Sequence, residues 1–215
     1  MAMLDDMPLR RSPLPPRLDL GEAAAAPSLI DAPVERAVFI ARNEIFTGDE
    51  TRLRDGDFVI RSTAGAWRTL SPADLGAIDP NTERSFSVSP GGGLLAFSDR
   101  KAILVVDVRS GSVRRLDVPF AEPIGLAWTP DERFVLASDR HAREERPVLV
   151  DARSGQIKAV PYSIFDTEFS PSGTAVELHL PDRGQRSKAH HPELRTYTAF
   201  GTFIGSTPLR LPGVI

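Results

Sequence analysis

The stretch FSVSPGGGLLAFSDRKAILVVDVRSGSVRRLDVP, residues 86–119, decides the fold. It holds four short apolar runs, rich in β-branched and aromatic residues, and turn signals made of Pro, Gly, Ser and Asp separate them. Much of this pattern is repeated about forty residues later in LAWTPDERFVLASDRHAREERPVLVDARSGQIKAVP, residues 126–161. Short runs of this kind between turn residues predict β-strands joined by tight turns.

Three dipeptides mark the period of the repeat, 40 and then 41 residues apart: Ser89-Pro90, Thr129-Pro130 and Ser170-Pro171. Each follows a short strand that carries an aromatic residue, and we expect these aromatics to be buried at equivalent first-strand positions: Phe86, Trp128 and Phe169. Proline ends the strand because it has no N–H group to donate to the ladder. Four antiparallel strands in about forty residues make one β-propeller blade.

A second turn closes each of the two clean copies of the repeat. The segments Asp107–Gly111 and Asp151–Gly155 both read Asp-x-Arg-Ser-Gly. Asp bonds the local backbone in such turns and Gly supplies a positive φ, so we expect Gly111 and Gly155 to have positive φ angles. Because one blade cannot bury both of its faces, neighbouring blades are expected to stack on one another.

Two segments carry a resemblance to a known family: Phe169–Gly173 followed by Ala175–Leu178, and Phe86–Phe97. They resemble the F-S-P-D-G-x-x-L-A-F repeat of bacterial Tol-type and WD-like β-propellers. The resemblance is clear over residues 84–180 and weaker over 35–70 and 190–209. It implies the fold and says little about activity. The Gly-His and Trp-Asp pairs of WD repeats themselves are absent, so that subfamily does not fit.

The repeat predicts an all-β fold of β-propeller-like repeats, with about four four-stranded blades of which one is incomplete. Two blades are clean, at 85–119 and 124–161, and a third at 166–209 has an inserted loop at 181–193. A fourth is partial: its strands at 37–41, 58–62 and 66–70 lack an obvious partner for the inner position.

Only residues 71–78 suggest a helix, with Ser71 at the N-cap and Pro72 at the first helical position. The blade count leaves the closure of the ring open, since closed propellers have about four to eight blades. One alternative is a tight ring in which the N-terminal arm or the C-terminal strand supplies the missing piece. The other is an open arc, whose unpaired edges favour a partner or a dimer.

The first 33 residues differ from the rest because prolines recur among small and charged residues: Pro8, Pro13, Pro15, Pro16, Pro27 and Pro33. Proline fixes φ and removes a backbone donor, so we interpret residues 1–33 as an extended or disordered N-terminal arm and residues 34–215 as the propeller domain. Residues 23–26, four alanines, fit one helical turn. Any apolar core of a secretory signal is interrupted by charged residues, Asp5, Asp6, Arg10 and Arg11, so we expect a cytoplasmic protein. The resemblance to Tol-type propellers implies a bacterial one.

Composition excludes several classes of protein. The net charge is −3, whereas nucleic-acid-binding domains are strongly basic, so we expect no nucleic-acid partner. No stretch approaches the ~18 apolar residues of a membrane helix, so we expect no membrane partner. The chain has no cysteine, which excludes a disulfide framework and a thiolate metal site.

No catalytic residue and no cofactor is assigned, because the phosphate-binding loop, the zinc-protease motif and the nucleophile elbow are all absent. The pairs Asp99-Arg100 and Asp139-Arg140 fit a ring of charges on one propeller face. Strand-end turn residues and surface ion pairs are the favoured interpretation of these pairs.

The histidines His190 and His191 are weak candidates for a metal site. They lie in and around the inserted loop with three further possible ligands: His179, Asp182 and Glu193. Two adjacent imidazoles on an extended chain do not point the same way, so a metal would need a ligand from elsewhere.

Two functions remain. The first is a non-enzymatic protein-binding module, either self-associating or bound to a partner, and an immunity or inhibitor protein that holds an effector or toxin is one concrete form of it. Its partner-binding candidates are charged residues of two loops: Arg143, Glu144, Glu145, Arg146, Arg183, Arg186 and Lys188. The alternative is a propeller-type hydrolase or lactonase with a divalent metal in the central channel, for which Glu168 is the only interior-facing acid expected.

Overall fold

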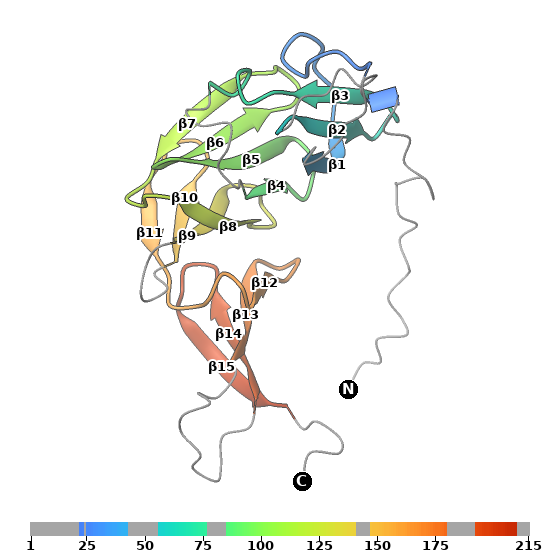
Figure 1. Cartoon of the computed structure of the whole chain (residues 1–215). Coiled ribbons are helices and arrows are strands. Elements are labelled where there is room, and N and C mark those ends of the chain that lie inside the picture. The colour runs from blue at the N-terminus through green and yellow to red at the C-terminus, as the bar shows by residue number, and fades with distance from the viewer. Residues whose placement is uncertain are drawn as a thin grey trace.

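The residues that the computed structural model describes form fifteen β-strands, and only Glu22 and Ala23 among them are helical (Figure 1). The described residues are 22–23, 25–42, 56–76, 85–140, 147–179 and 192–209. No helix within these ranges is long and apolar enough to cross a membrane.

The strands form four antiparallel sheets, in which neighbours in the chain are neighbours in the sheet. The first sheet has three strands: β1 (Ala37–Arg42), β2 (Phe58–Ser62) and β3 (Trp67–Leu70). The second has four: β4 (Phe86–Val88), β5 (Leu94–Asp99), β6 (Ala102–Asp107) and β7 (Val113–Asp117). The third has β8 (Pro123–Trp128), β9 (Phe134–Asp139), β10 (Val148–Asp151) and β11 (Ile157–Ala159), and the fourth has β12 (Thr167–Phe169), β13 (Thr174–His179), β14 (Glu193–Thr198) and β15 (Phe203–Pro208).

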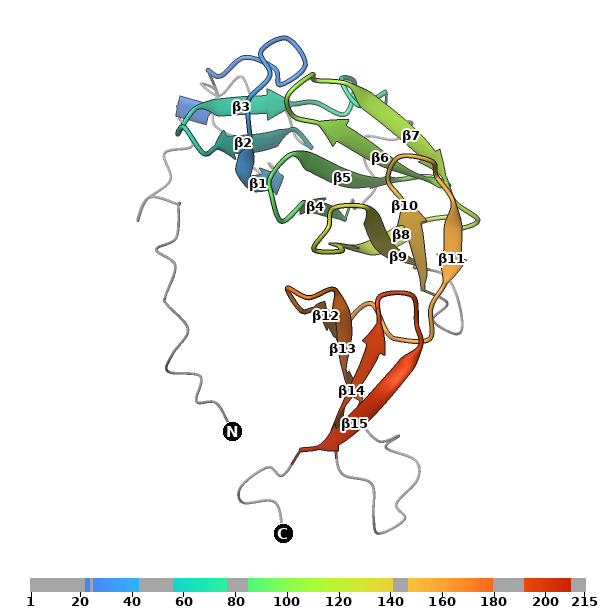
Figure 2. The ribbon, with the colours of Figure 1, turned by 180° about the vertical axis from the view of Figure 1, so that it is seen from behind.

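The four sheets follow one another around an arc, as Figures 1 and 2 show from opposite sides. The first strand of each sheet lies on the inner side of the arc, and β1 contacts β4 as β4 contacts β8. This is how blades are arranged in a propeller, so the all-β, propeller-like prediction is confirmed, including its incomplete blade. The first and last sheets lie at the two ends of the arc in both views.

The vacant position of the incomplete blade is not the one that the sequence predicts. Its inner position is filled by β1, and no full strand of the described residues lies beyond β3. There Ser28 forms a parallel bridge with Thr69, with Leu29 N donating to Thr69 O at 2.8 Å and Thr69 N donating to Pro27 O at 3.0 Å. The prediction of an inner gap was wrong because β1 lacks the Ser-Pro turn by which the other inner strands are recognised.

The described part of the predicted arm packs against the blades. Leu29 is fully buried in the core between the first and second sheets, and Ala23 is fully buried against the first sheet. Val34 N donates to Val108 O at 2.8 Å, which joins the arm to the second sheet. Residues 1–21 lie outside the described residues, so an extended or disordered conformation stays a prediction for them.

The aromatic markers of the repeat are not all equivalent. Trp128 and Phe169 are each the last residue of the first strand, opposite Val135 and Ala175. The matching residue of the second sheet is Val88, and Phe86 lies two residues earlier. The prediction of equal positions was therefore wrong for Phe86, although a shift of two residues keeps its side chain on the same face. Trp128 is buried, as expected, whereas Phe86 and Phe169 are half-buried.

The central sheets are buried on both faces, because alternate residues of one strand enter different cores. On β5, Leu95 and Phe97 pack between the first and second sheets, and Ala96 packs between the second and third. On β9, Val135 packs toward the second sheet and Leu136 toward the fourth. Strands with a period of two place neighbouring side chains on opposite faces, so this continuous apolar pattern fits a stack of blades.

The predicted helix at residues 71–78 is a turn over its described part, residues 71–76. Ser71 N donates to Asp74 Oδ2 at 2.9 Å, and Asp74 N donates to Ser71 Oγ at 3.1 Å. Leu75 is buried in the core between the first two sheets, and Gly76 follows with a φ of 61°. The capping bonds of a helix start are therefore present, but the positive φ of Gly76 ends the turn.

The two Asp-x-Arg-Ser-Gly turns have the predicted conformation. In each turn the Asp Oδ1 accepts hydrogen bonds at 2.9–3.1 Å from the backbone N–H groups two and three residues further on. The φ angles of Gly111 and Gly155 are 69° and 73°, which confirms the expected left-handed positions.

These two glycines form a matched pair for testing how the arm packs. An alanine Cβ at Gly155 meets only Leu116 Cδ2, at 3.7 Å, so Gly155→Ala should lower the free energy of unfolding by about 1 kcal/mol through φ alone. A Cβ at Gly111 also meets Ile30 O at 2.9 Å, and we expect Gly111→Ala to cost about 1–3 kcal/mol more. Urea denaturation of both variants measures the difference, and equal losses would contradict the placement of Ile30 on this turn.

Protonation of Asp151 is expected to reduce the stability of the third sheet at low pH. The Ser154 N–H group, and after it the Arg133 guanidinium at 3.0 Å, lower the pKa of Asp151 from 3.8 to about 2. Because the unfolded chain binds the proton first, the contribution of Asp151 is complete above about pH 4 and is lost as the pH falls through 2. Urea denaturation from pH 5 to 2 should show a loss of about 2 kcal/mol from this group. The loss should be absent from Asp151→Asn, and an unchanged pH profile would contradict the assignment.

Candidate functional site

The two ends of the arc differ in how their outward faces are covered. On the first sheet, Val59 and Trp67 are buried, and Ala23 from the arm packs against them. The edge of Phe39 meets the Trp67 ring, with 6.4 Å between ring centroids, and the Arg61 guanidinium lies 4.8 Å from the centroid of the same ring. This end of the arc is therefore capped by the chain itself.

The last sheet has one covered face and one face that the described residues leave uncovered. Cross-strand pairing places seven residues on the second face, which we name the open face: Glu168, Thr174, Val176, Leu178, Leu194, Thr196 and Thr198. The side chain of Leu178 is 36% exposed, and Val176 and Leu194 are half-buried. None of these three belongs to a core cluster of the described residues.

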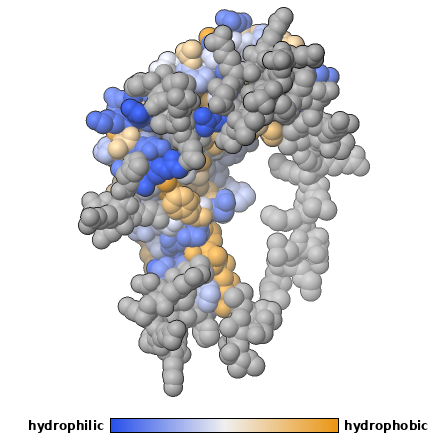
Figure 3. Space-filling view, in the orientation of Figure 1, coloured by the Kyte–Doolittle hydropathy of each residue, from blue (hydrophilic) through white to orange (hydrophobic). Residues whose placement is uncertain are grey.

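The space-filling view agrees with this description, because apolar residues gather in a band over the last sheet (Figure 3). Further apolar side chains are exposed on β15, where Phe203 and Ile204 are 55% and 56% accessible. The apolar surface of this blade is thus larger than the three aliphatic residues of the open face.

The open face is the counterpart of a face that is buried one blade earlier. Thr129 N donates to Phe134 O in the third sheet, and Ser170 N donates to Thr174 O in the fourth, so Thr174 corresponds to Phe134. Val176 then corresponds to Leu136, which is fully buried against the fourth sheet. The open face therefore has the position of an inter-blade contact.

The other face of the last sheet packs against the third sheet and against the connection at residues 160–164. Tyr162 OH donates to Ala199 O at 2.5 Å. The buried Glu177 accepts a hydrogen bond from Ser163 N at 2.8 Å through Oε1 and one from Tyr197 OH at 3.2 Å through Oε2. Two of these hydrogen bonds join the fourth sheet to the connection between β11 and β12, on the side opposite the open face.

Burial affects the two tyrosines of this contact in the same direction. Desolvation raises the pKa of Tyr162, and it also raises the pKa of Tyr197, to which the Glu177 carboxylate adds a smaller upward effect. Both phenols are thereby kept neutral to higher pH than a free tyrosine.

The histidine-rich region can be followed only in part. His179 lies opposite Glu193 across β13 and β14, and Arg195 Nε donates to Glu193 Oε1 at 2.6 Å. This hydrogen bond lowers the pKa of Glu193. No group of three His, Asp or Glu side chains within the described ranges is placed to hold a metal ion, and His190, His191 and Asp182 lie outside those ranges.

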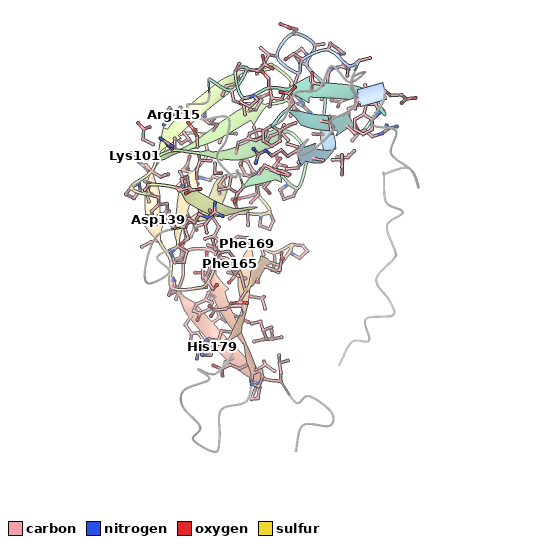
Figure 4. All side chains as sticks on the ribbon, viewed as in Figure 1. Lys101, Arg115, Asp139, Phe165, Phe169 and His179 are labelled. Carbon is pink, nitrogen blue, oxygen red and sulfur yellow. The ribbon has the colours of Figure 1, made fainter. Side chains whose placement is uncertain are left out.

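Several further predicted residues can be placed. Glu168 is exposed on the innermost strand β12, on the open face. Asp99 is wholly buried and forms an ion pair of 2.7 Å with Arg115, so the predicted surface position was wrong for this residue. Arg140 pairs with Glu122 at 3.0 Å, as predicted for a strand-end ion pair. Figure 4 shows Arg115 and Asp139 on the outer side of the arc, and Phe169 and His179 at opposite ends of the last sheet.

All seven charged loop residues proposed as partner contacts lie outside the described residues, and their role stays a prediction: Arg143, Glu144, Glu145, Arg146, Arg183, Arg186 and Lys188. Sequence reasoning missed the open face because the polar and apolar residues of the run Ala175–Leu178 alternate in a way that suggests the wrong buried face. Glu177 is buried and Leu178 is exposed, whereas an amphipathic strand predicts the reverse. The buried bonds of Glu177 to Ser163 and Tyr197 explain the inversion, and no local pattern reveals them.

No protein-family model and no curated protein matches the chain. Solved structures similar to it include TolB from Acinetobacter baumannii, with 15% identity and a TM-score of 0.49 over 74% of this chain and 39% of that one. A gluconolactonase from Xanthomonas campestris has 16% identity and a TM-score of 0.45 over 70% of this chain and 55% of its own. A putative TolB from Agrobacterium tumefaciens has 15% identity and a TM-score of 0.36 over 71% and 73%. This chain thus spans well under half of the first of these proteins.

Deprotonation of the two buried tyrosines beside the fourth sheet is expected to reduce the stability of the fold at high pH. Tyr162 and Tyr197 both have pKa values raised above 10.0, so the unfolded chain releases these protons first. Their contribution is complete below pH 10 and is lost as the pH rises beyond it. The melting temperature should fall between pH 10 and 12, and that of Tyr162→Phe should fall less steeply than that of the wild type. Parallel curves for the two proteins would contradict this assignment.

Proposed function

We propose that the chain is a protein-binding module and that its open face docks a β-sheet of a partner protein in the position of a next blade. The observation that supports this is the correspondence of Val176 with Leu136 and of Thr174 with Phe134. In the third sheet these positions are covered by a neighbouring sheet. A sheet on the open face would repeat the contact that the chain already makes between its own blades.

The chemistry of the open face suits a sheet rather than a charged ligand. Its centre is aliphatic, threonines flank it, and Glu168 is its only charged member. Burying a Leu or Val side chain contributes roughly 1.5–3 kcal/mol, and threonine hydroxyls tolerate either water or a polar partner. Such a face fits the uncharged core and polar rim of protein interfaces.

A finer form of the proposal is that the chain is a cytoplasmic bacterial immunity or inhibitor protein, whose partner is an effector or toxin that it holds inactive. The small size and acidic balance of the chain are compatible with that role. The activity of the captured partner, measured with and without the chain, tests this form separately from binding itself.

Site-specific photocrosslinking tests the docking proposal. A benzophenone amino acid at position 178, in the open face, is compared with the same amino acid at position 157, where Ile157 is 41% exposed on β11. We expect position 178 to give a discrete crosslink to a single protein in native cells, mapped to a β-strand of that protein, and position 157 to give none. Adding Val176→Asp, which places a charge on the open face, should abolish the crosslink.

Three outcomes would contradict the proposal. One is an identical set of crosslinks from positions 178 and 157. Another is a crosslink from position 178 to residues 1–21 or 210–215 of the same molecule, which would show that the chain covers the face itself. The last is the absence of any crosslink from position 178 in cells. A crosslink between two copies of the purified chain would identify the partner as a second copy.

A further inference from the structure

A groove distinct from the open face lies at the end of the second and third sheets where the Asp-x-Arg-Ser-Gly turns are found. It has a volume of about 460 Å³. Its apolar lining comes from Leu94, Val105 and Ala152, all of which belong to or pack on the core between these sheets. A second hollow of about 640 Å³ shares Leu94, Glu132 and Arg153 with it, so the two form one extended groove.

In a chain whose net charge is −3, four arginines line the first hollow: Arg36, Arg109, Arg114 and Arg153. The second hollow adds Asp131 and the ion pair of Arg133 with Asp151, at 3.0 Å. Backbone carbonyls position two of the four arginines. Arg114 Nη1 donates to Ala152 O at 3.0 Å and to Arg153 O at 3.1 Å, and Arg109 Nε donates to Glu35 O at 3.2 Å. A neutral carbonyl fixes a guanidinium without cancelling its charge, so Arg114 is held ready for an anion. Arg109 also pairs with Glu35 Oε1, at 4.0 Å.

The two acids of the first hollow are engaged by backbone groups. Asp107 Oδ1 accepts from the N–H groups of Arg109 and Ser110, and Glu132 accepts a short hydrogen bond from Gly91 N. Glu132 has a φ of 58°, an uncommon value for a residue with a side chain, and this places its carboxylate across the junction of the two sheets. Within the described residues, no carboxylate forms an ion pair with Arg36 or Arg153.

We propose that this groove binds an acidic peptide segment, with carboxylates on the arginines and an apolar side chain on Leu94, Val105 and Ala152. A free inorganic anion would use the arginines and leave the apolar lining exposed. An extended peptide uses both, because alternate side chains reach different parts of a groove and carboxylates pair well with guanidinium groups. This site is independent of the open face, so either one can fail without the other.

The probe is a fluorescein-labelled peptide with the sequence Asp-Glu-Leu-Asp-Glu, titrated with the full chain and followed by fluorescence anisotropy. The test variant is Arg36→Gln with Arg153→Gln. The matched control, Lys101→Gln with Lys158→Gln, removes the same two charges away from the groove, and Figure 4 shows Lys101 on the outer side of the arc. Melting temperatures verify that both variants are folded.

We expect the arginine variant to weaken binding by about tenfold and the lysine variant by less than about twofold. A peptide with Ser in place of Leu should bind more weakly, and Asn-Gln-Leu-Asn-Gln should not bind. Equal weakening by both double variants would overturn the proposal, since it would show attraction by net charge alone. Unchanged affinity of the Ser peptide, with full competition by millimolar phosphate, would overturn it in favour of a simple anion site.

Discussion

Burial of both faces of every blade is the constraint on which the rest of this structure depends. A strand such as β5 sends Leu95 to one core and Ala96 to another, so the second sheet is stable only between two neighbours. The first sheet has one neighbouring blade, and its other face is closed by Ala23 of the arm. The last sheet also has one neighbouring blade. Its open face has the same need to be buried, but none of the described residues covers it.

The turns keep these faces in register. Because the side-chain period of a strand is two, a slip of one residue would exchange the two cores of a central blade. The Asp-x-Arg-Ser-Gly turns prevent such a slip, since the Asp side chain bonds two backbone N–H groups and the glycine takes a φ of about 70°. The same turns bring the arginines together at one end of the second and third sheets, so the element that sets the register also shapes the arginine-lined groove.

The sequence allowed the strands, the antiparallel blades, the incomplete blade and the conformations of Gly111 and Gly155 to be predicted, because each depends on neighbours in the chain. Two features could not be predicted from it because they depend on contacts between distant segments. The packing of Leu29 on the blades is set by Thr69 and Val108 rather than by the local proline pattern. The burial of Glu177 needs Ser163 and Tyr197, and without them the open face is assigned to the wrong side of its strand.

Thiol labelling at position 178 tests most directly whether the open face accepts another sheet. The natural chain has no cysteine, so Leu178→Cys introduces a single reactive thiol, with Ile157→Cys and Leu136→Cys as exposed and buried references. The account predicts that Cys at 178 reacts as fast as Cys at 157 in the dilute purified chain and becomes protected in native cells, while Cys at 157 stays reactive. Labelling at 178 that is as slow as at 136 in the purified chain, or as fast in cells as in isolation, would contradict it.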